Sequence, residues 1–454
     1  MRGRAGVRAC GLLSAVAPTQ RIAIIGAGWA GMAAAVRAVQ DGHQVTVFEA
    51  ARTLGGRARG VPLTLPDGRE LSVDNGQHIL IGAYADTLRL MRLVNVDPQE
   101  ALLRLPMALT FPDGTGLSLP DLPTPLDALA GILRARGWAW RDKLALLRVA
   151  SSWQRVGFRC KEHASVADLC AALPSRLMKE FIEPLCVSAL NTPLEQASGA
   201  VFLRVLHDGL FSQRGGSNFL LPRWDLSALF PSAAARWLSE RGARVLTGRR
   251  IEVLRRQAPH WQIDDELFDS AVLAVSASES ARILAASSPE AEEPLRNEMN
   301  AWAAKAAALR FQAITTVYAQ AESPSNASLL TRPLLALRPN DQYPAQFVFD
   351  RDQITQAVEP SRLLAFVISA SQGERLALEA AVTAQAQSQL GLAVKPLQTI
   401  IEKRATFACT PALVRPAARI AAGLAACGDY IEGPYPATLE GAVQSGWGVP
   451  EKLS

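Results

Sequence analysis

The 454-residue sequence contains few of the residues that build metal centres and disulfide frameworks. Its six cysteines include no CxxC pair, and none of its five histidines stands at ligand spacing from another. We therefore expect no metal and no disulfide scaffold, and a reduced cytoplasmic setting is the simplest interpretation. No uncharged apolar run reaches the roughly 18 residues that a membrane-spanning helix needs, so a transmembrane helix is not expected.

Lysine and blocks of like charge are also scarce. Of the 47 basic residues only seven are lysines, and the arginines are spread along the whole chain, with a formal net charge of +5. Because no stretch resembles a basic arm, nucleic acid is not expected as a partner. Hydrophobic residues make up 49% and charged residues 20% of the chain, which predicts a globular protein of one or two large intertwined domains.

The first 20 residues differ in character from the rest of the chain. Three arginines precede a short apolar stretch, Ala9 to Ala17, a pattern that faintly resembles a signal peptide. A strand that must bind an intracellular cofactor begins immediately afterwards. We therefore expect residues 1–20 to form a disordered leader.

Residues 21–49 have the order of elements that binds a dinucleotide. An apolar β-branched run over 21–25 leads into the glycine turn GAGWAG at 26–31, an alanine-rich helical stretch comes next, and a second strand over 44–49 ends on an acid. A strand, a glycine turn, a helix and a strand in this order, with the acid 23 residues after the first glycine, predict a Rossmann-type site.

Each residue type in this stretch has a physical task. Gly26 permits the tight turn, Gly28 lets the backbone approach a pyrophosphate, and Gly31 allows the helix to pack closely on the strand. The first helical turn, with Trp29 and Ala30, offers backbone N–H groups to the phosphates. Glu49 accepts the ribose hydroxyls and would repel a 2′-phosphate, which argues against NADP.

A second glycine element stands shortly after Glu49. Gly55, Gly56 and Arg57 offer another backbone cradle and a guanidinium fork for the same pyrophosphate. With this extension the sequence resembles the flavin-dependent amine oxidase and phytoene desaturase superfamily. The resemblance implies FAD, whereas the spacing alone implies only a dinucleotide.

The resemblance also implies distant cofactor contacts. The backbone of Ile251 would contact the adenine, and Gly428-Asp429 would hold the ribityl or phosphate end of FAD. A helix-like run from Ala437 to Ser445 would direct its N-terminus, at Ala437, Thr438 and Leu439, toward the flavin, where its partial positive charge favours the anionic reduced form.

Cofactor segments at both ends and in the middle of the chain predict an interleaved α/β architecture. We expect a discontinuous Rossmann-like FAD-binding domain over residues 21–100, 209–275 and 405–446. An α+β substrate domain over residues 101–208 and 276–404 would be inserted through its crossovers.

Longer strings narrow the resemblance to the hydroxysqualene dehydroxylases, the squalene-associated FAD-dependent desaturases of hopanoid synthesis. The most specific are DNGQHIL at 74–80 and GDYIEGPYPATLEGAV at 428–443, and the resemblance covers residues 21–446. One departure is Phe347, where tryptophan is expected. The resemblance implies reduction of hydroxysqualene, a C30 isoprenoid, to squalene by hydride from reduced FAD, an oxidoreductase reaction at a CH or CH2 group.

Such a reaction needs a proton donor for the departing hydroxyl. His78 and Tyr435 are the main candidates because each stands beside a flavin-facing motif, and Gln77 belongs to the same motif as His78. Asp74 and Glu432 are weaker candidates. His78 is alternatively a structural partner of the backbone or of the flavin, and Tyr435 is alternatively an aromatic wall of the site.

Residues 127–156 interleave three tryptophans, Trp138, Trp140 and Trp153, with basic residues. An amphipathic helix of this composition suits peripheral contact with the cytoplasmic face of the inner membrane. Packing of its apolar side on the substrate domain is the equally weighted alternative.

Three other functions stay open. A carotenoid-type desaturase would run hydride transfer from the isoprenoid to FAD, and an amine oxidase would need an aromatic cage that the sequence does not reveal. A prenyl-group carrier of the same architecture would have no flavin, and the retained glycines and acids of the cofactor motifs argue against it.

Overall fold

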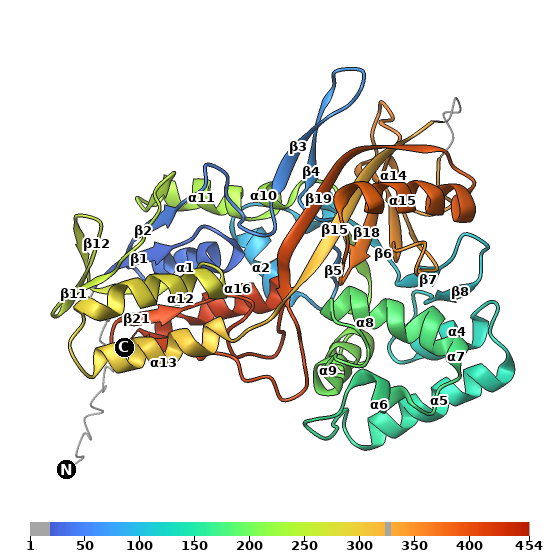
Figure 1. Cartoon of the computed structure of the whole chain (residues 1–454), viewed down its shortest axis with the longest axis horizontal. Helices are drawn as coiled ribbons and strands as arrows, with labels where there is room; N and C mark the ends of the chain where they lie inside the picture. Colours follow the sequence, from blue (N-terminus) through green and yellow to red (C-terminus); the bar gives the residue numbers. More distant parts are fainter. Residues whose placement is uncertain (1–18, 323–327, 454) are drawn as a thin grey trace, which may run out of the picture.

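The computed structural model describes residues 19–322 and 328–453. The leader expected over residues 1–20 therefore lies almost entirely outside the described residues. Within them the chain forms two halves, one around a parallel sheet and one around an antiparallel sheet (Figure 1). This is the mixed α/β class that the sequence predicted.

The parallel sheet arises directly from the dinucleotide pattern. Its strands stand in the order β10, β2, β1, β14, β21 and β20, and all neighbours are parallel except β21 and β20. β1 and β2 are buried along almost their whole length because both faces of a parallel sheet are covered. The bounds are β1 (Arg21–Ile25), β2 (Gln44–Glu49), β10 (Arg244–Thr247), β14 (Ser270–Leu273), β20 (Arg419–Ala421) and β21 (Leu424–Ala426).

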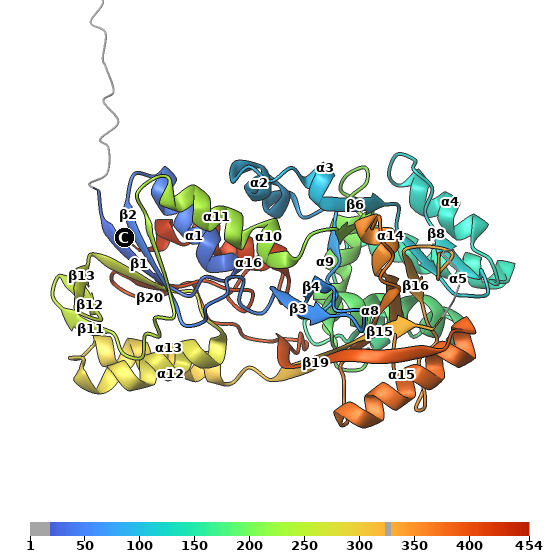
Figure 2. The same cartoon turned by 90° about the horizontal axis from the view of Figure 1, so that it is seen from above.

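Helices cover both faces of this sheet (Figure 2). One face carries α1 (Trp29–Gln40), α11 (Pro231–Ser239) and α16 (Leu439–Gly448), and the other carries α12 (Ala277–Ser287) and α13 (Leu295–Ala307). The indole Nε1 of Trp302 in α13 donates to the carbonyl of Ala417, just before β20, at 2.8 Å. Residues 277–307 thus pack with the parallel sheet, whereas our domain division assigned them to the substrate half.

The second half is built on an antiparallel sheet with the strand order β16, β17, β18, β15 and β19. β15 follows α13 in the chain and β19 precedes β20, and both strands run between the two halves (Figure 1). The bounds are β15 (Phe311–Ala321), β16 (Leu334–Ala336), β17 (Phe347–Asp350), β18 (Leu363–Ser369) and β19 (Val394–Phe407), with α14 (Arg351–Thr355) and α15 (Arg375–Leu390).

A group of helices lies beside this sheet: α4 (Leu126–Arg134), α5 (Trp140–Arg155), α6 (Val166–Cys170), α7 (Ser175–Leu177), α8 (Glu183–Leu190) and α9 (Gly199–Leu210). The prediction of a single helix over residues 127–156 is therefore wrong, because this stretch forms two helices, α4 and α5, separated by residues 135–139. The break contains Gly137, which adopts a left-handed φ of +84°, and Arg136, which exchanges two backbone hydrogen bonds with Gly116, at 2.9 and 3.0 Å.

Short elements connect these layers. Two of them are two-stranded ribbons: β3 (Gly60–Thr64) with β4 (Glu70–Asp74), and β7 (Ala108–Thr110) with β8 (Gly116–Ser118). Two are three-stranded sheets: one of β5 (Leu80–Ile81), β9 (Phe219–Pro222) and β6 (Leu102–Leu105), the other of β11 (Arg255–Gln257), β12 (His260–Ile263) and β13 (Glu266–Phe268). The remaining short helices are α2 (Ala85–Leu93), α3 (Pro98–Ala101) and α10 (Leu226–Leu229).

Candidate active site

A cavity of about 670 Å³ is lined by residues of both halves. It gathers the segments that the sequence singled out, although these lie up to about 400 positions apart. Of the cofactor residues and main donor candidates predicted for the site, Gly31 alone is absent from its lining. Those that line it are Gly26, Gly28, Trp29, Ala30, Glu49, Gly55, Gly56, Arg57, Gln77, His78, Ile251, Gly428, Asp429, Tyr435, Ala437, Thr438 and Leu439.

The three glycines of the first turn occupy different environments. Gly26 has a φ of +110°, and a Cβ there would collide with the carbonyl of Ala274. A Cβ on Gly31 would collide with the carbonyl of Gly26, so this glycine serves helix packing and needs no place in the lining. At Gly28 the nearest atoms to an added Cβ are 3.9 Å away, which leaves the backbone open to the cavity.

The N-terminus of α1 suits an anion. Gly28 is its N-cap without a side-chain hydrogen bond, and the first turn contains no acidic residue. Its backbone N–H groups therefore keep their partial positive charge for a phosphate in the cavity.

Glu49 closes the other side of this turn. One carboxylate oxygen accepts from the backbone N–H of Ala27 at 2.7 Å, and the other accepts from that of Ala51 at 2.8 Å. These bonds fix the carboxylate at the end of β2 while each oxygen keeps a lone pair for a ribose hydroxyl. The backbone N–H of Arg249 donates to the carbonyl of Glu49 at 2.8 Å, and Ile251, two residues further along the chain, is buried.

Arg57 and Asp429, 372 positions apart, form an ion pair at the cavity wall. Arg57 also donates to the carbonyl of Ala405 at 2.7 Å. Burial acts to lower the pKa of Arg57, but the Asp429 carboxylate outweighs it and the net shift is upward. We expected each of the two to contact the cofactor separately, and the structure adds that they hold each other.

The N-terminus of α16 also reaches the cavity. Thr438 caps it by accepting from the N–H of Gly441 at 3.0 Å, and Ala437 adopts a left-handed φ of +58° just before it. Gly446 allows α16 to lie against α1, since a Cβ there would collide with the carbonyl of Ala30. Close packing of two helices therefore brings both N-termini to one cavity.

Two residues of the segment 74–78 differ in their access to the cavity. His78 lines it, its Nδ1 is buried without a hydrogen-bond partner among the described residues, and burial lowers its pKa to about 4. Asp74 is fully buried outside the lining, where its Oδ1 accepts from Leu226 N–H at 2.9 Å. Asp74 is therefore wrong as a candidate donor to a ligand.

The two candidate donors near the C-terminus, Tyr435 and Glu432, also differ in their access to the cavity. Tyr435 lines the cavity, whereas Glu432 is exposed and does not. Sequence reasoning missed four acids of the lining: Asp208, Glu279, Glu402 and Glu440. Glu440, in the first turn of α16, accepts from the N–H groups of Asp86 and Thr87 at 3.0 Å each. Glu440 lies within the motif at 428–443, although no role was assigned to it from the sequence, whereas Asp208 belongs to α9 and stands in no motif that signals a site.

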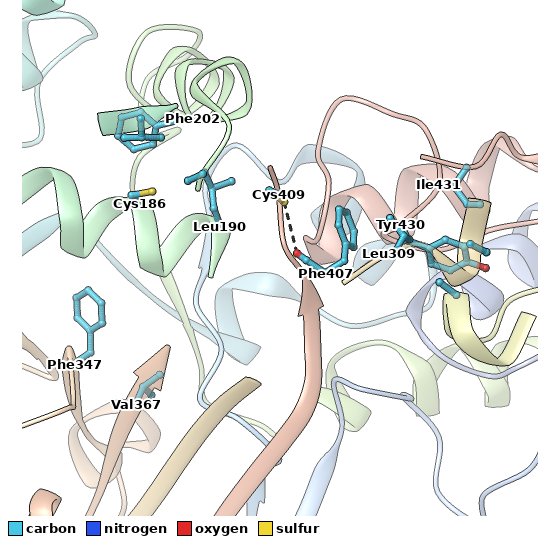
Figure 3. Close-up of a cluster of buried hydrophobic side chains, with 14 of the residues drawn as sticks. Cys186, Leu190, Phe202, Leu309, Phe347, Val367, Phe407, Cys409, Tyr430 and Ile431 are labelled. Carbon is cyan, nitrogen blue, oxygen red and sulfur yellow. Dashed lines mark hydrogen bonds between the residues drawn. The ribbon is translucent and has the colours of Figure 1, made fainter. Parts of the chain in front are cut away.

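Beyond the cofactor segments the cavity is lined mainly by apolar side chains. Figure 3 shows Leu190 of α8, Phe347 of β17 and Val367 of β18 in one buried cluster, and all three line the cavity. Further apolar lining comes from Met107, Leu109, Leu185, Ala189, Val201, Val205, Leu206, Leu210, Phe219, Ile314 and Phe349.

The described residues contain no group of three or more histidine, cysteine, aspartate or glutamate side chains arranged to hold a metal ion. Among the same residues, no helix combines the length and hydropathy that crossing a bilayer requires.

The residues present fit FAD. Gly28 leaves backbone open to the cavity, two helix N-termini reach it, and Gln77 Nε2 is a buried donor without a partner among the described residues. Glu49 lies at the strand end where a ribose is expected, and the ion pair of Arg57 with Asp429 lies on the same wall. These are the donors and acceptors that a flavin dinucleotide requires.

Comparisons with known proteins agree with this assignment. The family described as flavin containing amine oxidoreductase matches residues 29–449. The hydroxysqualene dehydroxylase of Rhodopseudomonas palustris is 24% identical over 465 aligned residues, which cover 94% of this chain and 97% of that protein. The hydroxysqualene dehydroxylase of Sinorhizobium fredii is also 24% identical, over 446 residues that cover 94% and 96%.

Among solved structures, an oxidoreductase from Methanosarcina mazei superposes with a TM-score of 0.71 at 16% identity, covering 95% of this chain and 100% of that one. At this identity the likeness shows the fold alone. The predicted architecture and the predicted resemblance are thereby confirmed. The chain belongs to the flavin containing amine oxidoreductase family, and it is an oxidoreductase whose cofactor is FAD.

Proposed function

We propose that this protein reduces hydroxysqualene to squalene in squalene and hopanoid synthesis. The observation that carries the proposal is one cavity that is lined both by the cofactor segments and by many apolar side chains. A C30 isoprenoid needs such a lining beside the cofactor, and the two relatives that match over nearly their whole length are hydroxysqualene dehydroxylases.

The reaction replaces a C–OH bond by a C–H bond, consumes one proton and one hydride, and releases water. FAD, when bound and reduced, supplies the hydride. The chain itself must hold the hydroxyl, deliver a proton to it and keep water away from the cationic carbon. The apolar side chains of α8, α9, β17 and β18 serve the last task.

His78 is suited to hydrogen bonding more than to strong acid catalysis. Because burial lowers its pKa to about 4, its imidazole is neutral at pH 7 and donates one N–H. We propose that His78 orients the ligand or the flavin, and that Tyr435 faces the departing hydroxyl. His78→Ala should then bind FAD normally and lose most turnover.

An anaerobic experiment tests the proposed reaction. Chemically reduced protein is mixed separately with hydroxysqualene, presqualene alcohol and phytoene, and flavin absorbance is followed. Reoxidation by hydroxysqualene with release of squalene is expected. Reduction of the oxidised protein by phytoene would instead establish the desaturase, and reduction by an amine would establish an amine oxidase.

We also propose that the protein takes its substrate from the inner membrane through a surface on α4 and α5. Leu126, Leu129 and Leu133 lie on one face of α4 and are 54%, 42% and 41% exposed, and Trp140 on α5 is 67% exposed. Trp138 and Trp153, which we grouped with Trp140 from the sequence, are buried. We call the exposed set, with Leu122 and Leu144, the α4–α5 patch.

Charge around the α4–α5 patch fits an anionic bilayer. The acids of these two helices, Asp127 and Asp142, are buried, whereas their arginines are exposed: Arg134, Arg141, Arg148 and Arg155. The loop before α4 contacts the cavity wall, because the hydroxyl of Thr124 donates to the carbonyl of the lining residue Leu210 at 2.8 Å. Apolar side chains ringed by arginine favour a lipid interface.

A further inference from the structure

One carboxylate that lines the cavity is incompletely hydrogen-bonded. Asp208, on α9, lines the cavity with a side chain that is 18% exposed. Its Oδ1 lies 2.6 Å from Nδ1 of His207, whose side chain is 46% exposed. Its Oδ2 is buried and, apart from the nearby phenol of Tyr435, faces no hydrogen-bond donor of the described residues. A buried acceptor left in this way costs free energy unless a ligand supplies a donor.

Tyr435 supplies the complementary group. It lines the same cavity, and burial together with the neighbouring Asp208 carboxylate raises the pKa of Tyr435 to about 12. The phenol therefore stays protonated at neutral pH and acts as a hydrogen-bond donor. Side by side, Asp208 offers one acceptor and Tyr435 offers one donor.

The surroundings of this pair are apolar. Val205, Leu206 and Leu210, on the same helix as Asp208, line the cavity around it. Tyr435 is two residues before Ala437, where the segment that caps α16 begins, so the pair stands between the cofactor segments and the apolar lining. A polar pair at such a border recognises one polar group on an otherwise apolar ligand.

We propose that Asp208 and Tyr435 bind the hydroxyl of a long apolar alcohol and thereby select it over the hydrocarbon. The Oδ2 of Asp208 accepts the O–H of the alcohol, and the phenol of Tyr435 donates to its oxygen. His207 is a positioning residue that holds Oδ1 from the exposed side. The identity of the alcohol as hydroxysqualene rests on the proposed function, whereas the selection of an alcohol does not require turnover.

The test measures binding to oxidised holoenzyme, with flavin absorbance as the readout and hydroxysqualene and squalene as the two ligands. Wild type should bind the alcohol more tightly. Asp208→Leu and Tyr435→Phe should each lower affinity for the alcohol about tenfold, as expected for one lost hydrogen bond of roughly 1.4 kcal/mol. Affinity for squalene should stay within about twofold, since the apolar contacts remain.

Asp265→Leu, a change at an exposed acid between β12 and β13, is the matched control and should alter neither affinity. FAD content and melting temperature report folding, and Tyr435→Phe keeps the ring if Asp208→Leu does not fold. An unchanged ratio of the two affinities in both cavity variants, or equal affinities in wild type, overturns the inference. Asp208-dependent selection without squalene formation would instead reject only the proposed reaction.

Discussion

Asp74, which is buried, and His78, which is partly buried, respond to pH in opposite directions. Burial raises the pKa of Asp74 to about 7, against the opposing charge of Arg351, and lowers the pKa of His78 to about 4. Relative to the unfolded chain, native Asp74 binds more protons between about pH 4 and 7, and native His78 binds fewer between about pH 4 and 6.5. Each shift corresponds to about 3–4 kcal/mol, so in wild type the two largely cancel.

Single variants should reveal these opposing contributions. The stability that neutral His78 provides is lost as the pH falls through 6.5 toward 4. The free energy of unfolding of His78→Gln should therefore rise relative to that of wild type by about 3 kcal/mol over that interval. The stability that protonated Asp74 provides to the fold is lost as the pH rises through 7. The free energy of unfolding of Asp74→Asn should therefore rise relative to that of wild type as the pH rises. The amide oxygen of asparagine can still accept from Leu226 N–H.

Melting temperatures of wild type and both variants between pH 4.5 and 8 check this prediction. The two difference curves, each variant minus wild type, should slope in opposite directions. Parallel or flat difference curves would contradict the assigned pKa shifts.

Gly28 and Gly31 are three positions apart, and alanine substitutions at the two should have different effects on FAD binding and stability. Gly28→Ala adds a Cβ into open space, so the apoprotein should keep its melting temperature, but the Cβ blocks the approach of a pyrophosphate and affinity for FAD should fall at least tenfold. Gly31→Ala drives a Cβ into the carbonyl of Gly26 and should destabilise the apoprotein by about 1–3 kcal/mol.

FAD titration and thermal melting of the apoprotein separate these two effects. A Gly28→Ala variant that binds FAD as tightly as wild type would remove this turn from the cofactor site. A Gly31→Ala variant with an unchanged melting temperature would contradict its packing role.

Sequence patterns located residues whose task is local and missed those whose task is tertiary. The glycines around Gly28 carry a fixed spacing because turn, backbone approach and helix packing all occur within six residues. Asp208 has no such spacing, since its role depends on a buried carboxylate oxygen beside Tyr435 that only the folded cavity reveals. Asp74 is the first residue of the DNGQHIL motif yet faces the interior, because β4 places its side chain against the N–H of Leu226.

At the scale of elements, the helical stretch over 127–156 shows the limit of periodicity. Its apolar spacing predicted helix correctly, but the pairing of Arg136 with Gly116 interrupts it, and the N–H of Ala139 donates to Asp142 at 3.0 Å to begin α5. Two of its three tryptophans are buried as a result. The exposed surface is therefore carried by the leucines of α4 and by Trp140.

The α4–α5 patch predicts measurable membrane binding. Replacing Leu126, Leu129 and Leu133 together by glutamine should lower partitioning onto vesicles of phosphatidylglycerol and phosphatidylethanolamine at least tenfold, because three apolar side chains no longer enter the lipid. Leu376→Gln, at a 77% exposed leucine of α15 outside the patch, is the control and should bind as wild type does. Vesicle co-sedimentation makes the comparison.

Equal binding of the triple variant and wild type would exclude the α4–α5 patch. A loss of binding without a change in melting temperature or FAD content would assign the lipid contact to this patch.

At the scale of the whole molecule, the order of cofactor segments along the chain was enough to predict an interleaved fold. The structure brings Gly28, Arg57, Ile251 and Asp429 to one cavity, and β15 and β19 run between the two halves (Figure 1). The family resemblance, and not residue spacing, related the distant Arg57 and Asp429 to one cofactor. The position of α12 and α13 was missed because amphipathic helices carry no mark of the sheet on which they pack.

If the proposed reaction is correct, hydride from reduced FAD bound in this cavity reaches the carbon that loses the hydroxyl. A single turnover of anaerobically reduced protein with hydroxysqualene in D2O tests it directly, because the reduced flavin exchanges its transferable hydrogen with solvent. The account predicts squalene that carries one deuterium at the former hydroxyl carbon. Squalene without deuterium, or no squalene from fully reduced protein, would contradict it.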